Sequence, residues 1–183
     1  MYRAFPPFAA WRFVDAVDGF EVVYLEPGRL RGHTSAVEDG RAHAVAYEIT
    51  LDAGWRTRSV RVSSDTVGGL RITELLSDGQ GRWTVDGRPA PRLDGLLDVD
   101  LEASACTNTL PVHRLTLPVG KEVATPAVYV QAADLTVRRL DQSYRRLDDD
   151  RFAYRSEGGF EAVLTYDAYG LVLDYPGIAA RFA

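Results

Sequence analysis

Two aspartates in the middle of the chain are the residues best placed to do chemistry. Asp98 and Asp100 are two positions apart on a predicted strand, so their carboxylates project from the same face of it. Paired carboxylates can act as acid and base on a sugar-like substrate, where they have to flank the bond that breaks. They can also bind a hard cation if further oxygen ligands, such as Asn108, lie nearby. Neither function comes with a distinctive spacing here, and the alternative is that both aspartates form the solvated side of the strand.

A polar run follows these aspartates, with a cysteine before it and a histidine after it. Cys106 and His113 could serve as nucleophile and base. No nucleophile motif accompanies them, and a single cysteine is usually a small buried hydrophobic side chain. We therefore assign no catalytic residue. The run itself, Thr107-Asn108-Thr109-Leu110-Pro111, predicts an ordered loop that leads into an edge strand over residues 112–117.

The elements that must position these residues are short strands. Apolar residues alternate with other residues over 42–52, which is the pattern of a half-buried strand. Turn signals recur at short intervals along the rest of the chain, as in sandwiches, rolls and barrels. Helix signals are weak, with at most a turn of helix at 7–13 and at 178–182. We predict an all-β domain over residues 1–183, with strands at 42–52, 55–64, 68–77, 83–85, 97–102, 112–117, 127–131, 135–144, 151–156, 160–166 and 171–175.

Charged residues interrupt the face of two strands that otherwise looks like core. In the strand over 55–64, Arg56 and Arg58 share a face with two valines. In the strand over 68–77, Glu74 shares a face with three aliphatic residues. The simplest pairing of these strands puts Arg58 directly opposite Glu74. Buried charges without partners cost several kcal/mol each, so this pattern predicts either an internal ion pair or the rim of a pocket.

The composition limits the function further. The net charge of −5 argues against a general nucleic-acid binder. A single cysteine excludes an intramolecular disulfide, and the three histidines are scattered, so we expect no metal site and no cofactor. Neither a signal peptide nor a membrane-spanning segment is evident, and we expect a cytoplasmic protein without integral membrane association. The sequence does not indicate an oligomeric state.

Six short motifs, spread over nearly the whole chain, form a recognisable series. They are Trp55-Arg56-Thr57-Arg58, Asp98-Val99-Asp100-Leu101, Thr107-Asn108-Thr109-Leu110-Pro111, Arg114-Leu115, Gln142-Ser143-Tyr144 and Tyr175-Pro176. In this order and at these spacings they resemble the family of bacterial putative glycolipid-binding proteins. The stretch from Thr107 to Pro111 is the most specific of them. His113 departs from the family, in which arginine is more frequent at this position, and if the position contacts an anion its charge here depends on pH.

The resemblance implies both a fold and a ligand. The fold is a single curled antiparallel sheet, a spiral β-roll similar to that of periplasmic carriers of outer-membrane lipoproteins. The implied ligand is a glycolipid. Similarity of fold alone does not establish a function, so the assignment has to come from the site.

The first hypothesis is non-catalytic binding of an amphipathic small molecule, a lipid or glycolipid, in the cleft of the roll. Aromatic side chains would line its apolar part, and arginines with the Thr107–Thr109 run would hold a polar head. We expect contacts across the cleft between Arg56, Arg58 or Arg114 and Asp98, Asp100 or Glu74. The predicted ligand-binding residues are Trp55, Arg56, Arg58, Glu74, Asp98, Asp100, Thr107, Asn108, Thr109, His113, Arg114, Gln142, Tyr144 and Tyr175.

Two alternatives belong to other classes of protein. One is a hydrolase or isomerase that acts on a sugar-like substrate through Asp98, Asp100 and His113. The other is a scaffold that binds a protein through an exposed strand edge. The interior of the fold discriminates between them. An open, largely apolar cavity favours a lipid, a small polar cleft with both carboxylates near His113 favours catalysis, and a filled interior favours the scaffold.

Overall fold

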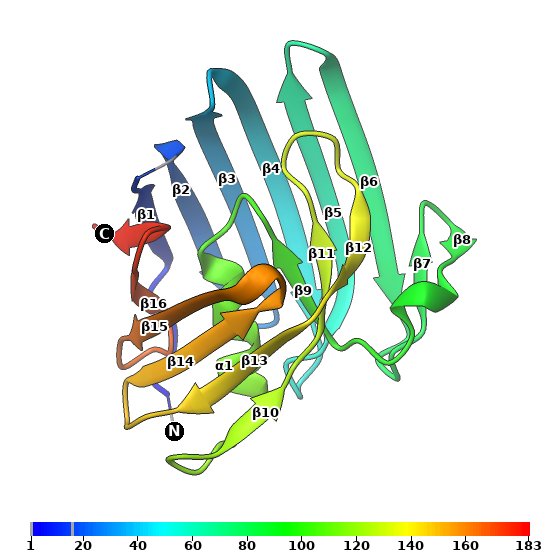
Figure 1. Cartoon of the computed structure of the whole chain (residues 1–183). Helices are drawn as coiled ribbons and strands as arrows, with labels where there is room; N and C mark the ends of the chain where they lie inside the picture. The colour runs from blue at the N-terminus through cyan, green and yellow to red at the C-terminus, as the bar shows by residue number, and fades with distance from the viewer. Residues whose placement is uncertain (1, 16) are drawn as a thin grey trace.

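The computed structural model describes residues 2–15 and 17–183, and within them the chain is mainly β (Figure 1). Fourteen strands form one large antiparallel sheet, which confirms the predicted strand-rich class. In spatial order they are β10 (Glu122–Ala124), β13 (Gln142–Arg146), β14 (Arg151–Ser156), β15 (Phe160–Tyr166), β16 (Val172–Tyr175), β17 (Ala179–Arg181), β1 (Phe8–Phe13), β2 (Val17–Glu26), β3 (Arg29–Glu38), β4 (Arg41–Leu51), β5 (Thr57–Thr66), β6 (Gly69–Ser77), β7 (Trp83–Val85) and β8 (Arg88–Pro89).

The two ends of the chain pair with each other and so join the two halves of the large sheet. β1 pairs with β17, which places Trp11 opposite Arg181 and Phe13 opposite Ala179. The predicted turn of helix at each end is therefore wrong. Both segments are short and apolar, and periodicity alone does not distinguish strand from helix in such a run. Pairing with each other satisfies the backbone groups of both strands.

A second, smaller sheet was not predicted, so the expectation of a single antiparallel sheet is incomplete. It consists of β12 (Val137–Leu140), β11 (Ala127–Val130) and β9 (Asp98–Leu101), in that order. β9 and β11 run parallel. Parallel neighbours need a long crossover between them, and residues 102–126 provide it.

The only α-helix in the described residues lies in this crossover. α1 (Thr109–Arg114) follows the 3₁₀ turn η2 (Cys106–Asn108), so the predicted loop and edge strand over 112–117 are wrong. Pro111 is tolerated because it lies in the first helical turn, where amide groups have no acceptor within the helix. No helix among the described residues has the length and apolar character needed to cross a membrane. The remaining 3₁₀ turns are η1 (Pro91–Leu93) and η3 (Glu157–Gly159).

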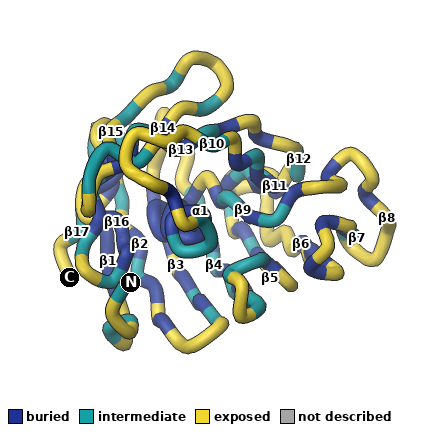
Figure 2. The backbone as a smooth tube through the Cα atoms, turned by 90° about the horizontal axis from the view of Figure 1, so that it is seen from below, coloured by how far each residue is buried: buried dark blue, intermediate teal, exposed yellow. Residues whose placement is uncertain are grey.

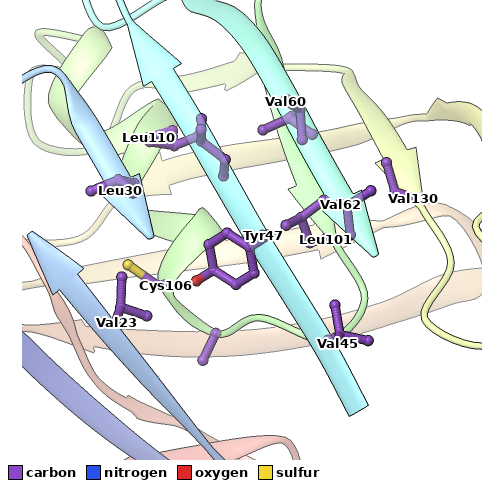
Figure 3. Packing of buried hydrophobic residues seen from close by; sticks show 14 of the residues in the cluster. Val23, Leu30, Val45, Tyr47, Val60, Val62, Leu101, Cys106, Leu110 and Val130 are labelled. Atoms are coloured by element: carbon purple, nitrogen blue, oxygen red, sulfur yellow. The ribbon is translucent and has the colours of Figure 1, made fainter. Parts of the chain in front are cut away.

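The central segment, residues 98–114, lies inside the fold between two parts of the large sheet. Figures 1 and 2 show α1 and β9 between β2–β4 on one side and β13–β15 on the other. On the first side Val45, Tyr47 and Ile49 of β4 are buried, as their alternation predicts, and Tyr47 points toward Cys106 (Figure 3). On the other side a second apolar cluster packs around Val112 of α1; it includes Tyr144, Phe152, Tyr154, Leu164, Tyr166, Val172 and Tyr175.

A β-bulge removes Arg58 from the core face on which it was predicted to lie. Thr50 pairs with Ser59, but the next residue, Leu51, pairs with Thr57, so Arg58 is the extra residue of β5. An extra residue shifts the alternation of side chains by one position. Thr57 is therefore buried and Arg58 is exposed, although counting in twos from the buried valines of β5 predicts the reverse.

The predicted opposition of Arg58 and Glu74 is also wrong. The β5–β6 turn is shorter than expected, with Thr66 paired to Gly69, and this register places Arg61 opposite Glu74. A register shift by one residue exchanges the two faces of a strand. Glu74 and the three aliphatic residues on the same face of β6, Leu70, Ile72 and Leu76, therefore face solvent on the outer side of the sheet. There Glu74 forms an ion pair with Arg61.

A wholly buried carboxylate connects the large sheet to the central segment. Glu21 of β2 accepts hydrogen bonds from the Tyr47 hydroxyl at 2.5 Å and from the backbone amides of Ala105 and Cys106 at 3.0 and 3.3 Å. Burial raises the pKa of Glu21 to about 7, against the opposing effect of these hydrogen bonds. The carboxylate thus titrates near neutral pH while it is enclosed by protein.

The raised pKa of Glu21 predicts a specific pH dependence of stability. A carboxyl group whose pKa is higher in the folded than in the unfolded protein stabilises the folded state. This contribution is complete below the pKa of the unfolded state, and it is lost as the pH rises through the pKa of the folded state. Glu21→Gln removes the titration. We expect wild type to lose about 3 kcal/mol of unfolding free energy relative to Glu21→Gln as the pH rises from 4.5 to about 7.

Urea unfolding across this pH range measures the difference. Glu26→Gln, which removes an exposed carboxylate from the same strand, serves as the control and should run parallel to wild type. Parallel pH curves for wild type and Glu21→Gln would contradict the prediction.

Candidate functional site

A cavity of about 590 Å³ opens at one end of the central segment. Its volume is within the usual range for small-molecule sites, which is about 300–1,000 Å³. The ends of β3 and β4, the small sheet and the β14–β15 hairpin contribute to its wall. Its apolar lining includes Phe13, Leu101, Leu140, Tyr154, Phe160, Tyr175 and Ile178, and its polar lining includes Glu38, His43, Asp100, Glu102, Ser104, Asn108, Arg138, Ser156 and Glu157.

Asp100 is one of three predicted site residues that line this cavity, together with Asn108 and Tyr175. It projects from β9 and accepts a hydrogen bond from the Thr107 hydroxyl at 2.9 Å. Burial raises the pKa of Asp100 to about 6; the Thr107 bond opposes the shift, and the nearby charges of Asp98 and Glu102 add to it. Asp100 is therefore an acceptor held in one orientation, with most of its negative charge present at neutral pH.

Asn108 adds an amide group next to this carboxylate. Its side-chain oxygen accepts a hydrogen bond from the Tyr144 hydroxyl at 2.7 Å, and its backbone oxygen accepts one from the Tyr166 hydroxyl at 3.1 Å. Since Tyr144 occupies the amide oxygen, the amide NH₂ is the group of Asn108 that remains for the cavity it lines. The two tyrosines belong to β13 and β15, so the far part of the large sheet orients Asn108.

Three aromatic rings form one apolar wall of the cavity. Tyr154, Phe160 and Tyr175 come from β14, β15 and β16 and have ring centroids 5.9–6.1 Å apart in edge-to-face arrangements. Such contacts hold each ring by its neighbours. Tyr175 was among the predicted ligand-binding residues, whereas Tyr154 and Phe160 were not.

Three charged residues of the cavity lining, Glu102, Arg138 and Glu157, are bound by other protein groups. Glu102 accepts hydrogen bonds from the Tyr129 hydroxyl at 2.8 Å and from the Ala132 amide at 2.7 Å. Arg138 lies over the Tyr129 ring, 4.5 Å from its centroid, and forms an ion pair with Glu157. The guanidinium at the cavity is therefore already neutralised by the protein.

Asp98 and Arg114 form a buried ion pair behind the cavity wall. Arg114 donates two hydrogen bonds to the two carboxylate oxygens of Asp98, at 2.8 and 2.6 Å, and Asp98 is wholly buried. The expected contact between an arginine and a central aspartate is confirmed for this pair, but the two residues do not face each other across a cleft. The pair joins α1 to β9 and does not line the cavity. Thr109 and Gln142 are also buried, and they do not line the cavity. Thr107 and Tyr144 orient cavity residues, because Thr107 donates a hydrogen bond to Asp100 and Tyr144 donates one to Asn108.

Trp55 and His113 lie in a different place, along a second groove of about 1,210 Å³. The Trp55 ring stacks on the His113 ring, with centroids 3.9 Å apart, and Tyr2 packs against His113 at 4.5 Å. The His113 Nε2 atom lies 2.9 Å from the Tyr169 carbonyl oxygen, and burial lowers the pKa of His113 to about 4. The imidazole is therefore neutral at neutral pH, and it lines a different cavity from Asp100.

Arg56 and Arg58 hold a turn and line neither cavity. Arg56 donates to the Gly79 carbonyl oxygen at 3.3 Å, and Arg58 donates to the Ser77 carbonyl oxygen at 3.1 Å. The turn favours glycine at position 79 because its φ is +78°; a Cβ atom there would also lie 2.7 Å from Arg58 Nη1, which is the end of a flexible side chain and can move aside. With Glu74 on the outer face, none of these three predicted residues contributes to the 590 Å³ cavity.

The structure accounts for Cys106 as a core residue. It is wholly buried, and burial together with the charge of Glu21 raises the pKa of its thiol. A nucleophile would need a lowered pKa and access to substrate. Among residues 2–15 and 17–183, no group of three or more histidine, cysteine or acidic side chains is arranged to hold a metal ion.

Several cavity residues gave no signal in the sequence. Glu38, His43, Arg138 and Ser104 come from separate elements that only the tertiary fold brings together. Tyr154 could have been found, because its strand was predicted with the correct ends and its position alternates with solvent-facing residues.

Comparisons with known proteins agree with the fold. A family model described as "Putative glycolipid-binding" matches residues 8–181. A crystal structure of a DUF1089 family protein from Pseudomonas aeruginosa is 34% identical in sequence and superposes with a TM-score of 0.86, covering 94% of this chain and 95% of that one. A search of curated proteins gives no match.

The buried ion pair generates a stability prediction. Arg114→Ala leaves the Asp98 charge buried without a partner, so we expect a loss of about 3–5 kcal/mol in unfolding free energy. The double variant Arg114→Met/Asp98→Leu should recover most of this loss, because an apolar pair needs no compensation.

Urea unfolding at neutral pH measures these energies. Arg61→Ala is the matched control, since it breaks an exposed arginine–glutamate pair and should cost less than about 1 kcal/mol. Equal losses for Arg114→Ala and Arg61→Ala would show that the buried pair is not structural.

Proposed function

Because the chain belongs to the family described as "Putative glycolipid-binding", we propose that it is a cytoplasmic protein that binds an amphipathic small molecule, a lipid or glycolipid, in the 590 Å³ cavity. One observation carries the proposal. The same cavity is lined by aromatic and aliphatic side chains and by two polar groups that hydrogen bonds hold in place, Asp100 and Asn108. A ligand with a polar head and an apolar chain matches both surfaces.

The apolar wall alone supports only weak binding. Burying a chain of eight carbons contributes at most about 6 kcal/mol. Loss of translational and rotational freedom offsets much of this gain. Contacts of the head with Asp100 and Asn108 therefore have to add both affinity and specificity, and the rest of a longer chain would extend past the exposed rim at Glu38 and Gly158.

The proposal includes the spiral β-roll that the resemblance implies. In it the large sheet wraps around the central segment, and β13–β15 return across β2–β4 as Figures 1 and 2 suggest. Apolar residues of the segment belong to both apolar clusters of the interior. The ligand is then held in the 590 Å³ cavity, next to Asp100 and Asn108 of the segment.

The geometry gives less support to the two alternatives. Catalysis through Asp98, Asp100 and His113 would require all three to reach one substrate. Asp98 is wholly buried and bound to Arg114, and His113 lines the second groove instead. A scaffold with a filled interior does not account for the cavity.

Blocking the cavity tests the proposal. Ser156→Trp places an indole in the cavity, because Ser156 lines it from β14. We expect native mass spectrometry of the protein from its own host to detect a copurified lipid mass in wild type that is absent from Ser156→Trp. In calorimetric titrations of ligand-free protein, octyl β-D-glucoside should bind wild type and lose about tenfold or more in affinity with the variant.

The matched control is Ser63→Trp, the same substitution on the outer face of β5. It should retain the wild-type behaviour in both measurements. Absence of a copurified mass together with equal octyl glucoside binding by all three proteins would refute the cavity as the binding site.

A further inference from the structure

The polar residues that line the cavity carry an excess of negative charge. Four carboxylates line it, from Glu38, Asp100, Glu102 and Glu157, against the one guanidinium of Arg138. Arg138 is itself bound to Glu157. A ligand head in this place therefore meets acceptors and negative potential, and it finds no arginine that is free to pair with an anion.

Two of these carboxylates remain available to a ligand. Glu102 is occupied by a tyrosine hydroxyl and a backbone amide, and Glu157 is occupied by Arg138. Asp100 accepts one hydrogen bond from Thr107, through a single oxygen, and no other donor to it is found among the described residues. Glu38 lies at the exposed end of β3 and likewise has no side-chain partner within the described part of the chain.

A buried amide points to the same kind of ligand independently of the charges. Asn108 is only 4% exposed, and its oxygen is taken by the Tyr144 hydroxyl. No hydrogen bond from its NH₂ group to another of the described residues is found, and Asn108 lines the cavity. This donor therefore takes its acceptor from solvent or from a ligand, and a group that both accepts here and donates to Asp100 would satisfy the site. A hydroxyl does both.

We propose that the cavity selects an uncharged, hydroxyl-rich headgroup, such as a glycosyl unit, over an anionic head that carries phosphate, sulfate or carboxylate. Hydroxyls of the head donate to Asp100 and Glu38 and accept from Asn108, and the ring of the head packs its C–H groups on Tyr154 and Tyr175. An anionic head would face two carboxylates without a compensating cation, and such like-charge contacts cost several kcal/mol in other interfaces.

This inference deepens the proposed function and rests on it. It also replaces the predicted role of the arginines, because Arg56, Arg58 and Arg114 bind protein groups outside the cavity. Discrimination by charge arises instead from the acidic residues that line the cavity.

Two probes with the same chain and different heads test the selection: octyl β-D-glucoside and octyl sulfate, titrated below micelle formation at about pH 8, where the pKa of Asp100 leaves it ionised. We expect wild type to bind the glucoside about tenfold or more tightly than the sulfate. Asp100→Asn keeps the shape and removes the charge, so it should reduce this ratio several-fold, chiefly by improving sulfate binding. Glu38→Gln, at an exposed strand end where misfolding is not a concern, should change the ratio in the same direction.

The controls separate failure of this inference from failure of the proposed function. Asp94→Asn makes the same substitution at an exposed position outside the cavity and should leave the ratio unchanged. Binding of both probes with equal strength, or tighter binding of the sulfate, overturns the charge selection and leaves cavity binding intact. If neither probe binds, and Ser156→Trp behaves as wild type, both the selection and the proposed function fall.

Discussion

The hydrogen-bonded carboxylate of Glu21 is the interaction on which the interior of this fold depends. It holds the start of η2 against β2 and β4, because two backbone amides of the central segment and the Tyr47 hydroxyl all donate to it. An irregular segment can enter a core only if its backbone groups find partners there. Glu21 provides such partners where the chain leaves β9 and turns into the helix. The position of the segment then determines where the interior is filled and where a cavity remains.

The opposite side of the central segment is held by the same type of interaction. Tyr144 and Tyr166 donate to the side-chain and backbone oxygens of Asn108, and Arg114 neutralises Asp98. Buried polar groups stabilise little in net terms, but each one left unpaired is expensive. Such a network therefore favours one arrangement over its alternatives. It also orients the functional groups, since the bonds that fix Thr107 and Asn108 decide which atoms of Asp100 and Asn108 face the cavity.

Local alternation was enough to predict several strands, and β7, β14 and β15 have the predicted ends. The errors occur where the outcome depends on partners distant in sequence. β1 and β17 are strands because they pair with each other across the whole chain, and α1 forms where the fold encloses it. The bulge at Arg58 shifted the alternation by one residue, and the shorter β5–β6 turn placed Glu74 on the outer face. A period of two carries no information about such a shift until the pairing is known.

The candidate site shows the same division between local and tertiary information. The motifs that resemble the family consist largely of residues that stabilise the central segment or the turns around it. Arg114 binds Asp98, Thr107 binds Asp100, and Arg58 binds the turn after β6. The residues that line the cavity come instead from the ends of six or more elements, and most of them belong to no motif. Asp100 and Asn108 are the polar residues that belong to both groups, and Leu101 and Tyr175 also belong to a motif and line the cavity. Asp100 and Asn108 have a chemistry that the sequence predicts and an environment that the fold determines, so selection of a ligand head depends on the packing behind them as much as on the side chains themselves.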